Sequence, residues 1–153
     1  MNAMITITRT TSDNLDFINL VAALDKELAI IDGDDHAFYS QYNKLDKIQH
    51  AIVAYKDELP VGCGAIKQFD SNSMEVKRMF VNPNGRNMGV ATTILKDLEN
   101  WAKELGYKKC LLETGKRQED AVALYTKNAY DLIPNYGQYE GVENSVCFEK
   151  VLG

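Results

Sequence analysis

Long apolar runs and a net positive charge are absent from this sequence of 153 residues, and their absence excludes two kinds of protein. No stretch approaches the roughly 18 apolar residues of a membrane-spanning helix. The net charge is −5 at pH 7, whereas nucleic-acid-binding domains carry a basic patch. We therefore expect neither a membrane protein nor a nucleic-acid-binding protein. The first residues also lack the basic and apolar segments of a secretory signal, which favours a cytoplasmic location.

Cysteine is scarce, and its number is odd, because the chain holds three. Cys63, Cys110 and Cys147 show no C-x-x-C spacing, and each stands in a strand-like stretch. Free cysteines in such surroundings are typically small buried hydrophobes, which fits a reducing cytoplasm. A covalent acyl-cysteine mechanism would need an activating histidine, and the chain has only His36 and His50. No metal site is predicted.

The length and composition predict one globular domain over residues 1–153. Hydrophobic residues make up 45% of the chain and charged residues 25%, which is enough for a sizeable core under a polar surface. No internal repeat or linker interrupts the chain. Residues 1–3 are given no role.

Hydrophobic periodicity predicts where the helices and strands lie. Strands are predicted over 5–9, 49–55, 61–69, 75–81, 108–114, 131–133 and 145–149, and helices over 15–28, 36–42, 91–105 and 119–128. Ser12 or Asp13 is predicted to cap the first helix, whose buried stripe includes Leu15 and Ala22. The second to fourth strands form an antiparallel meander. The strand–helix–strand unit that follows requires a parallel pair with a right-handed crossover.

The segment that joins the fourth strand to the third helix has the layout of an anion site. Asn82-Pro83-Asn84-Gly85 is a turn that follows a strand rich in β-favouring residues. Arg86 to Ala91 then leads directly into an amphipathic helix, and Gly89 leaves backbone N–H groups accessible at the start of that helix. Such groups, together with the helix dipole, favour a phosphate.

The same segment resembles a known family. Arg86-Asn87-Met88-Gly89-Val90-Ala91 has the form Arg-x-x-Gly-x-Ala and follows a strand that ends Val-x-Pro. It resembles the acyl-CoA pyrophosphate loop of the GCN5-related N-acetyltransferases, the GNAT family. A second segment, from Gln118 to Tyr130, resembles that family's Ala-x-x-Leu-Tyr helix. The resemblance implies an α/β domain with a mixed central sheet, an antiparallel N-terminal meander, a splayed pair of parallel strands and helices on both faces.

The resemblance implies acetyl-CoA as a co-substrate and no metal. The cofactor is expected to insert between the splayed strands, where its pantetheine amides pair with strand backbone. Its pyrophosphate is expected on the main chain of the loop, with Arg86 adding charge. Asn87 stands where many relatives have Gly, and Gln118 where many have Asn. The implied cofactor contacts are Met79, Phe80, Val81, Arg86, Asn87, Met88, Gly89, Val90, Ala91 and Gln118.

Transfer of an acetyl group to an amine requires a base for the ammonium proton and a proton donor for the leaving thiolate. Tyr125 is predicted as the donor from its position in the family motif, and an ordinary buried aromatic is the alternative. Glu75 is predicted as the base, because family members often place a glutamate on this strand. By strand alternation Glu75 and Met79 should face the same side, unless a β-bulge intervenes. Glu113, His36 and a water molecule are the alternatives for the base.

The predicted function is an acetyl-CoA-dependent N-acetyltransferase that moves the acetyl group to a primary amine of a small molecule by direct attack in a ternary complex. Residues 32–42 and 135–139, with their acids and tyrosines, are the predicted walls of the acceptor site. The alternatives are a protein or peptide amine acetyltransferase, a non-catalytic acyl-CoA binding or sensing domain, and an unrelated phosphate-binding α/β domain. A monomer or homodimer is expected.

Overall fold

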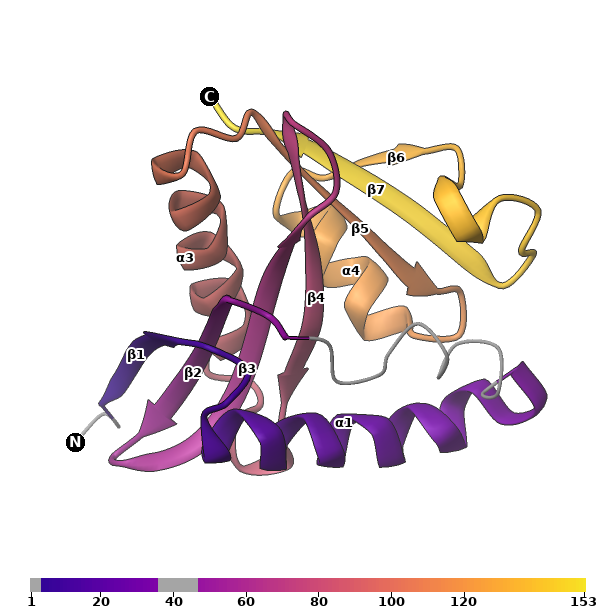
Figure 1. Ribbon diagram of the computed structural model, residues 1–153. Helices are drawn as coiled ribbons and strands as arrows, with labels where there is room; N and C mark the ends of the chain where they lie inside the picture. Colours follow the sequence, from indigo (N-terminus) through magenta and orange to yellow (C-terminus); the bar gives the residue numbers. More distant parts are fainter. Residues whose placement is uncertain (1–3, 36–46) are drawn as a thin grey trace.

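A seven-stranded sheet with helices on both faces makes up the computed structural model, which describes residues 4–35 and 47–153 (Figure 1). The strand order is β1-β2-β3-β4-β5-β7-β6. One face packs against α1 (Leu15–Asp32), and the other packs against α3 (Val90–Glu104) and α4 (Glu119–Lys127). The expectation of an α/β fold with a mixed sheet is confirmed. The short helix predicted over 36–42 lies outside the described residues.

The first four strands form an antiparallel meander, which includes the one predicted from the sequence. They are β1 (Ile5–Thr10), β2 (His50–Lys56), β3 (Leu59–Gln68) and β4 (Ser73–Val81). A two-residue turn joins β2 to β3, and its residues Asp57 and Glu58 have left-handed φ values of 48° and 75°. Left-handed residues in such a turn match the twist of the flanking strands, which is why it closes the hairpin.

The parallel pair predicted from the sequence is formed by β4 and β5 (Lys109–Gly115), with α3 as the crossover. The two strands pair only from Ser73, opposite Lys109, to Glu75, opposite Leu111. β4 continues to Val81, but beyond Glu75 no described strand pairs with its β5 side. The far edge of β5 pairs with β7 (Ser145–Val151), which in turn pairs with β6 (Asp131–Ile133). The two parallel strands therefore splay apart, as expected.

A β-bulge interrupts β4 next to this opening. Cys63 on β3 pairs with Phe80, whereas Ala65 pairs with Lys77, so β4 contains one more residue than β3 between these two pairs. Arg78, within the bulge, adopts a left-handed φ of 61°. An extra residue in one strand reverses the alternation of side chains beyond it.

The reversal is visible in the packing of the side chains along β4. Met74 and Val76 belong to the core beneath α3 before the bulge, and Met79 packs against that same core after it. Glu75, which lies between Met74 and Val76, therefore faces the opposite side, toward α1. The expectation that Glu75 and Met79 face the same side is wrong, because the bulge intervenes.

The cap of α1 also differs from the prediction. The side-chain oxygen of Asn14 accepts a hydrogen bond from Phe17 N at 3.0 Å, so Asn14 is the N-cap and the choice of Ser12 or Asp13 is wrong. Ser12 has another role, because its Oγ accepts a hydrogen bond from Ile48 N at 2.9 Å. This bond joins the start of α1 to the segment before β2.

The buried face of α1 is only partly as predicted. Leu15 is 75% exposed and Ala22 is exposed, whereas Phe17, Leu20 and Val21 are buried against the sheet. Apolar residues occur on several sides of this helix, so periodicity alone does not select the buried one.

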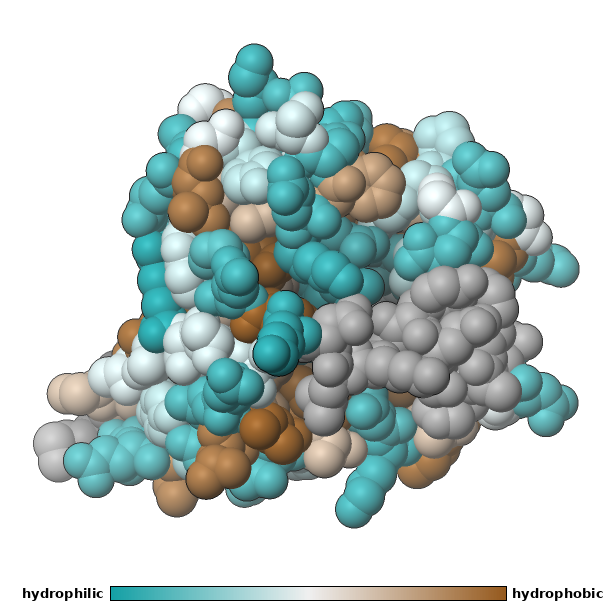
Figure 2. Space-filling view, in the orientation of Figure 1, coloured by the Kyte–Doolittle hydropathy of each residue, from teal (hydrophilic) through white to brown (hydrophobic). Residues whose placement is uncertain are grey.

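In the space-filling view, the described residues of the visible face are mostly hydrophilic, and their apolar side chains form small separate groups (Figure 2).

Two further predictions about local structure are confirmed. Gly106 follows the end of α3 with a left-handed φ of 93°. The three cysteines are buried and free. Single turns of 3-10 helix occur at η1 (Gly33–Asp35), η2 (Pro83–Gly85) and η3 (Gly137–Tyr139). Among the described residues, no helix combines the length and apolar character needed to cross a membrane.

Candidate active site

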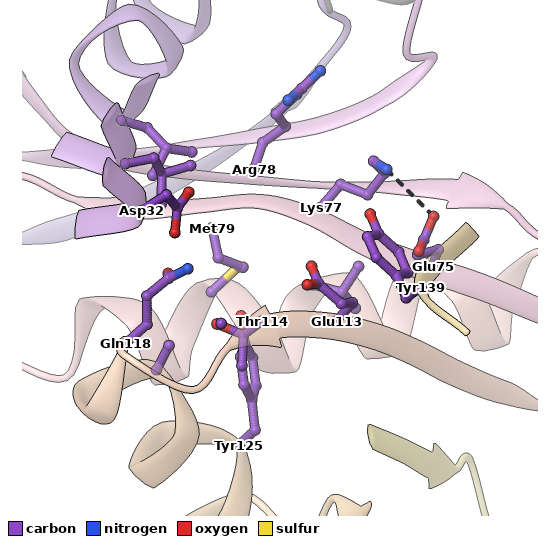
Figure 3. Close-up of a pocket in the computed structure, with 15 residues that line it drawn as sticks. Asp32, Glu75, Lys77, Arg78, Met79, Glu113, Thr114, Gln118, Tyr125 and Tyr139 are labelled. Carbon is purple, nitrogen blue, oxygen red and sulfur yellow. Dashed lines mark hydrogen bonds and ion pairs between the residues drawn. The ribbon is translucent and has the colours of Figure 1, made fainter. Parts of the chain in front are cut away.

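A cleft opens where β4 and β5 diverge (Figure 3). Together with the part open to solvent, it measures about 760 Å³. Residues of α1, β4, β5, α4 and the η3 turn line it. The side chains labelled in Figure 3 are Asp32, Glu75, Lys77, Arg78, Met79, Glu113, Thr114, Gln118, Tyr125 and Tyr139.

The cleft passes through the sheet, because its lining comes from both faces. Glu75 pairs with Leu111 in the parallel register, so both side chains, and that of Glu113 two residues later, point toward the α1 face. Met79 points toward the α3 face, and Tyr125 comes from α4 on that same side. A ligand could therefore enter from one face and meet a second ligand that enters from the other.

Glu75 is held from two directions. It is 8% exposed, and its Oε2 accepts a hydrogen bond from the hydroxyl of Tyr136 at 2.6 Å. Its Oε1 lies 3.4 Å from Nζ of Lys77. Tyr136 packs edge-on against Phe69, with ring centroids 5.0 Å apart. The loop predicted as an acceptor wall is thus anchored directly to β4.

Glu113 lies across the opening, on β5. Its Oε2 accepts a hydrogen bond from the hydroxyl of Ser145 at 2.7 Å. Burial raises the pKa of Glu113 to about 7, with the hydrogen bond from Ser145 acting in the opposite direction and the charge of Glu75 adding to the rise. A carboxyl group with this proton affinity can exchange a proton at neutral pH.

Tyr125 closes the cleft on the α4 side. It is 6% exposed, and its ring packs edge-on against that of Tyr130, with centroids 5.7 Å apart. Burial, followed by the charge of Glu113, raises the pKa of Tyr125 above its usual value. The phenol is therefore protonated throughout the neutral pH range and can donate a proton, but it cannot serve as a resting base.

The loop before α3 has the backbone of an anion site. Asn82 caps the η2 turn by accepting a hydrogen bond from Gly85 N at 3.2 Å. Asn87 and Gly89 are left-handed, with φ values of 64° and 73°, and Gly89 is the N-cap of α3. Because glycine has no side chain to satisfy the first N–H groups of the helix, those groups can bind an anion. Asn tolerates the left-handed region better than most residues, which fits its presence at position 87.

Arg86 points away from the start of α3. Its Nε donates to the carbonyl of Val81 at 2.9 Å, and its guanidinium lies 2.9 Å from the carboxylate of Glu27 on α1. Arg117, in the β5–α4 loop, donates to the carbonyl of Asp32 at 2.8 Å, so a second arginine also contacts α1. Both arginines therefore link α1 to the end of the sheet where β4 and β5 diverge.

The other residues predicted to contact the cofactor occupy several environments. Gln118 lines the cleft, with its amide nitrogen close to Gly115. Phe80 and Val90 are buried, with exposed fractions of 8% and 2%, so only their backbones could meet a ligand. The remaining three are the half-buried Val81 and Ala91 and the 39% exposed Met88.

His50 does not line the cleft. His50 lies on β2 and contacts Trp101 edge-on, with ring centroids 4.8 Å apart. His36, an alternative for the base, lies outside the described residues. Sequence reasoning missed Ser145, because its meeting with Glu113 depends on the antiparallel register of β5 and β7 and no local pattern signals it.

Comparison with known proteins agrees with this geometry. The model of the acetyltransferase (GNAT) family matches residues 18–130. The chain therefore belongs to the GNAT family. The IAA acetyltransferase of Azospirillum brasilense is 36% identical over 102 residues, which cover 66% of this chain and 67% of that protein. The uncharacterized N-acetyltransferase YsnE of Bacillus subtilis is 34% identical over 98 residues, 63% of this chain and 64% of that protein.

Solved structures show the same architecture over the full length. A Klebsiella pneumoniae protein, described as a candidate acyl-CoA N-acyltransferase, aligns with a TM-score of 0.83 at 30% identity, covering 99% of this chain and 100% of that one. A GNAT acetyltransferase of Elizabethkingia anophelis, solved with acetyl-CoA bound, aligns with a TM-score of 0.68 at 20% identity, covering 97% and 98%. At that identity the second likeness concerns the fold alone.

Proposed function

We propose that this protein is an acetyl-CoA-dependent N-acetyltransferase that transfers the acetyl group to a primary amine of a small molecule by direct attack in a ternary complex. The observation that carries the proposal is the opening between β4 and β5, which passes through the sheet and is lined by Tyr125, Glu75 and Glu113. Direct attack requires that both substrates reach one point at the same time, and a cleft open to both faces allows this.

The residues around the opening fit acetyl-CoA. Beyond Glu75, the β5 side of β4 has no described partner strand, so its backbone at Met79, Phe80 and Val81 can pair with the pantetheine amides. The loop from Arg86 to Ala91, with its two left-handed residues, would hold the pyrophosphate through main-chain N–H groups. Within this set, Met88, Gly89 and Val90 act through backbone. Gln118 would contact the cofactor from α4, and bound acetyl-CoA supplies the thioester.

In this proposal Tyr125 donates a proton to the leaving thiolate, a role supported by its protonated state and its place at the cleft wall. A carboxylate takes the proton from the acceptor ammonium. Glu75 stays the predicted base and Glu113 the alternative, and both line the cleft.

The acceptor would approach from the α1 face. Asp32, from the predicted wall 32–42, and Tyr139, from the wall 135–139, both line the cleft there. Carboxylates and phenols in these positions favour a small cationic amine. A protein or peptide amine and a non-catalytic acyl-CoA sensor are the rival functions. The cytoplasmic location, the single domain over 1–153 and the monomer or homodimer stay predictions.

The test is the release of CoA thiol from acetyl-CoA in the presence of a panel of amines. Tyr125→Phe should lower turnover at least about 100-fold while leaving the affinity for acetyl-CoA nearly intact, because only the proton donor is removed. Tyr107→Phe, at a half-buried tyrosine outside the cleft, is the matched control and should behave as wild type. Unchanged turnover in Tyr125→Phe would remove this residue from its role.

A thermal measurement separates the rivals. Acetyl-CoA at 100 times its dissociation constant should add about 2.7 kcal/mol to the free energy of unfolding and raise the melting temperature. Stabilisation without thiol release by any amine or peptide would favour the sensor. Stabilisation by nucleotides but not by acetyl-CoA would overturn the proposal.

A further inference from the structure

Two carboxylates face each other across the acceptor side of the cleft, and their surroundings differ. Glu75 lies on β4 and Glu113 on β5, and both point toward the α1 face. The two oxygens of Glu75 are each engaged, one by Tyr136 at 2.6 Å and one by Lys77 at 3.4 Å. Glu75 is therefore oriented by two donors, and neither of its oxygens is left without a partner.

Glu113 is the less restrained of the pair. Its described hydrogen bond is the single one from Ser145, which reaches Oε2 from β7 at 2.7 Å. The Glu113 carboxylate points into the cleft between the strands (Figure 3). Tyr125 is close enough that the charge of Glu113 contributes to the raised pKa of the phenol. The two groups that an acyl transfer needs, a proton acceptor and a proton donor, thus meet at the same opening.

We propose that Glu113 takes the proton of the acceptor ammonium, and that Ser145 and Glu75 are positioning residues that act through Glu113. This inference rests on the proposed function and assigns the base to Glu113, the alternative named there, in place of Glu75. The titratable and polar groups that face Glu113 come from every element around it. They are Glu75 and Lys77 on β4, Asp32 at the end of α1, Tyr125 on α4, Tyr139 in η3, and Ser145 and Cys147 on β7.

The proton and bond changes balance as follows. The ammonium loses one proton to the Glu113 carboxylate, and the free amine forms a C–N bond with the thioester carbonyl carbon. The C–S bond then breaks, and the sulfur takes the proton of the Tyr125 hydroxyl. The new amide nitrogen returns its second proton to Tyr125, and Glu113 releases the first proton to solvent. The products are the N-acetyl compound, free CoA thiol and one proton.

Two neighbours of Glu113 act on its pKa in opposite directions. The hydrogen bond from Ser145 stabilises the charged carboxylate and so lowers the pKa of Glu113, whereas the negative charge of Glu75 raises it. Burial raises the pKa of Glu113 to about 7. The acidic limb of the pH profile of kcat/KM should therefore fall near neutral pH, since this limb reports the base in the free enzyme. Removing the Ser145 hydroxyl and removing the Glu75 charge should shift this acidic limb in opposite directions.

The experiment measures kcat/KM against pH for amine-dependent thiol release by the full chain. Glu113→Gln should lower kcat at least about 100-fold and abolish the acidic limb. Ser145→Ala should move the limb to higher pH, and Ser145→Thr, which keeps a hydroxyl, should restore it. Glu75→Gln should move the limb to lower pH without abolishing it.

The converse pattern would overturn the inference. If Glu75→Gln abolishes the limb and Glu113→Gln only shifts it, Glu75 is the base. A limb that survives unchanged in Glu113→Gln excludes Glu113. If Glu113→Gln fails to fold, the Ser145 and Glu75 variants decide the question. Opposite shifts of the acidic limb in these variants support Glu113 as the base. An unmoved limb in both would mean that Ser145 and Glu75 have only a structural role, and it would overturn the inference. A wild-type protein that releases no thiol with any amine would refute the proposed function instead.

Discussion

The two parts of β4 are the most informative comparison within this molecule. From Ser73 to Glu75 the strand is paired on both sides, and Met74 is 2% exposed in the core. From the bulge at Arg78 to Val81 it is paired with β3 alone, and Met79 is half-buried at the cleft. One strand thus changes from core element to cleft wall within a few residues.

The difference shows how the fold makes a site without a separate binding domain. Where β4 and β5 pair, the backbone hydrogen bonds of both strands are satisfied inside the sheet. Where the strands diverge, the free edge of β4 can pair with a ligand, and the bulge directs Met79 and Glu75 to different faces. The opening and the bulge together turn a sheet edge into a cleft.

The largest expected effect is a loss of stability when a methionine is replaced by alanine, and it should differ between the two parts of β4. Met74→Ala should lower the free energy of unfolding by about 2–5 kcal/mol, because it leaves a cavity in the closed core. Met79→Ala should cost less, because the half-buried side chain borders an open cleft that water can fill. Urea unfolding of the two variants measures the difference. Equal losses would mean that the two parts of β4 are packed alike.

The second expected effect concerns the pH dependence of stability on the open side. Burial raises the pKa of Glu113 from its ordinary value of 4.5 to about 7, so the folded state binds this proton more tightly than the unfolded state does. Ionisation therefore costs stability as the pH rises from about 4.5 to 7. Glu113→Gln should increase the free energy of unfolding by up to roughly 3 kcal/mol above about pH 8, at 1.36 kcal/mol per pKa unit.

The same variant should match wild type below about pH 4, where Glu113 is protonated in both states. Urea unfolding at the two pH values checks the prediction. Glu140→Gln, at an exposed glutamate in the loop before β7, is the control and should change stability little at either pH. A gain of equal size at both pH values would contradict the assigned proton affinity.

The smallest expected effect is the change in stability on replacing Asn87, in the loop between β4 and α3. Asn87 has a φ of 64°, so Asn87→Gly should be nearly neutral, whereas Asn87→Val should cost about 1–3 kcal/mol because a β-branched residue is strained there. Thermal melts measure the stability, and titration with CoA measures the affinity, which should fall only for Asn87→Val. A loss of affinity in Asn87→Gly would mean that the asparagine side chain itself contacts the cofactor.

Much of this organisation could be predicted from local sequence. Residues 131–133 form a strand with the predicted bounds, and Gly106 ends α3 as its position indicates. The loop from Arg86 to Ala91 lies at the start of a helix because turn residues, a glycine and an amphipathic run occur in a fixed order. These features depend on neighbours in the chain, which is why they are readable.

Other features escaped prediction because they depend on partners distant in sequence. The cap of α1 is Asn14, and Ser12 instead accepts a hydrogen bond from Ile48, 36 residues further along the chain. The bulge at Arg78 reflects the register of β3 and β4, and it reversed the predicted relation between Glu75 and Met79.

The sequence by itself determined the order of the strands, the loop at the start of α3 and the family, because each is written in residue types at short spacing. Only the tertiary structure decided which carboxylates share the cleft and what holds each one. Glu113 meets Ser145, and Glu75 meets Tyr136, across strand and loop contacts that no local pattern encodes. The physical reason is that proton affinity follows from burial and from the charges brought close by folding, and both are properties of the assembled sheet.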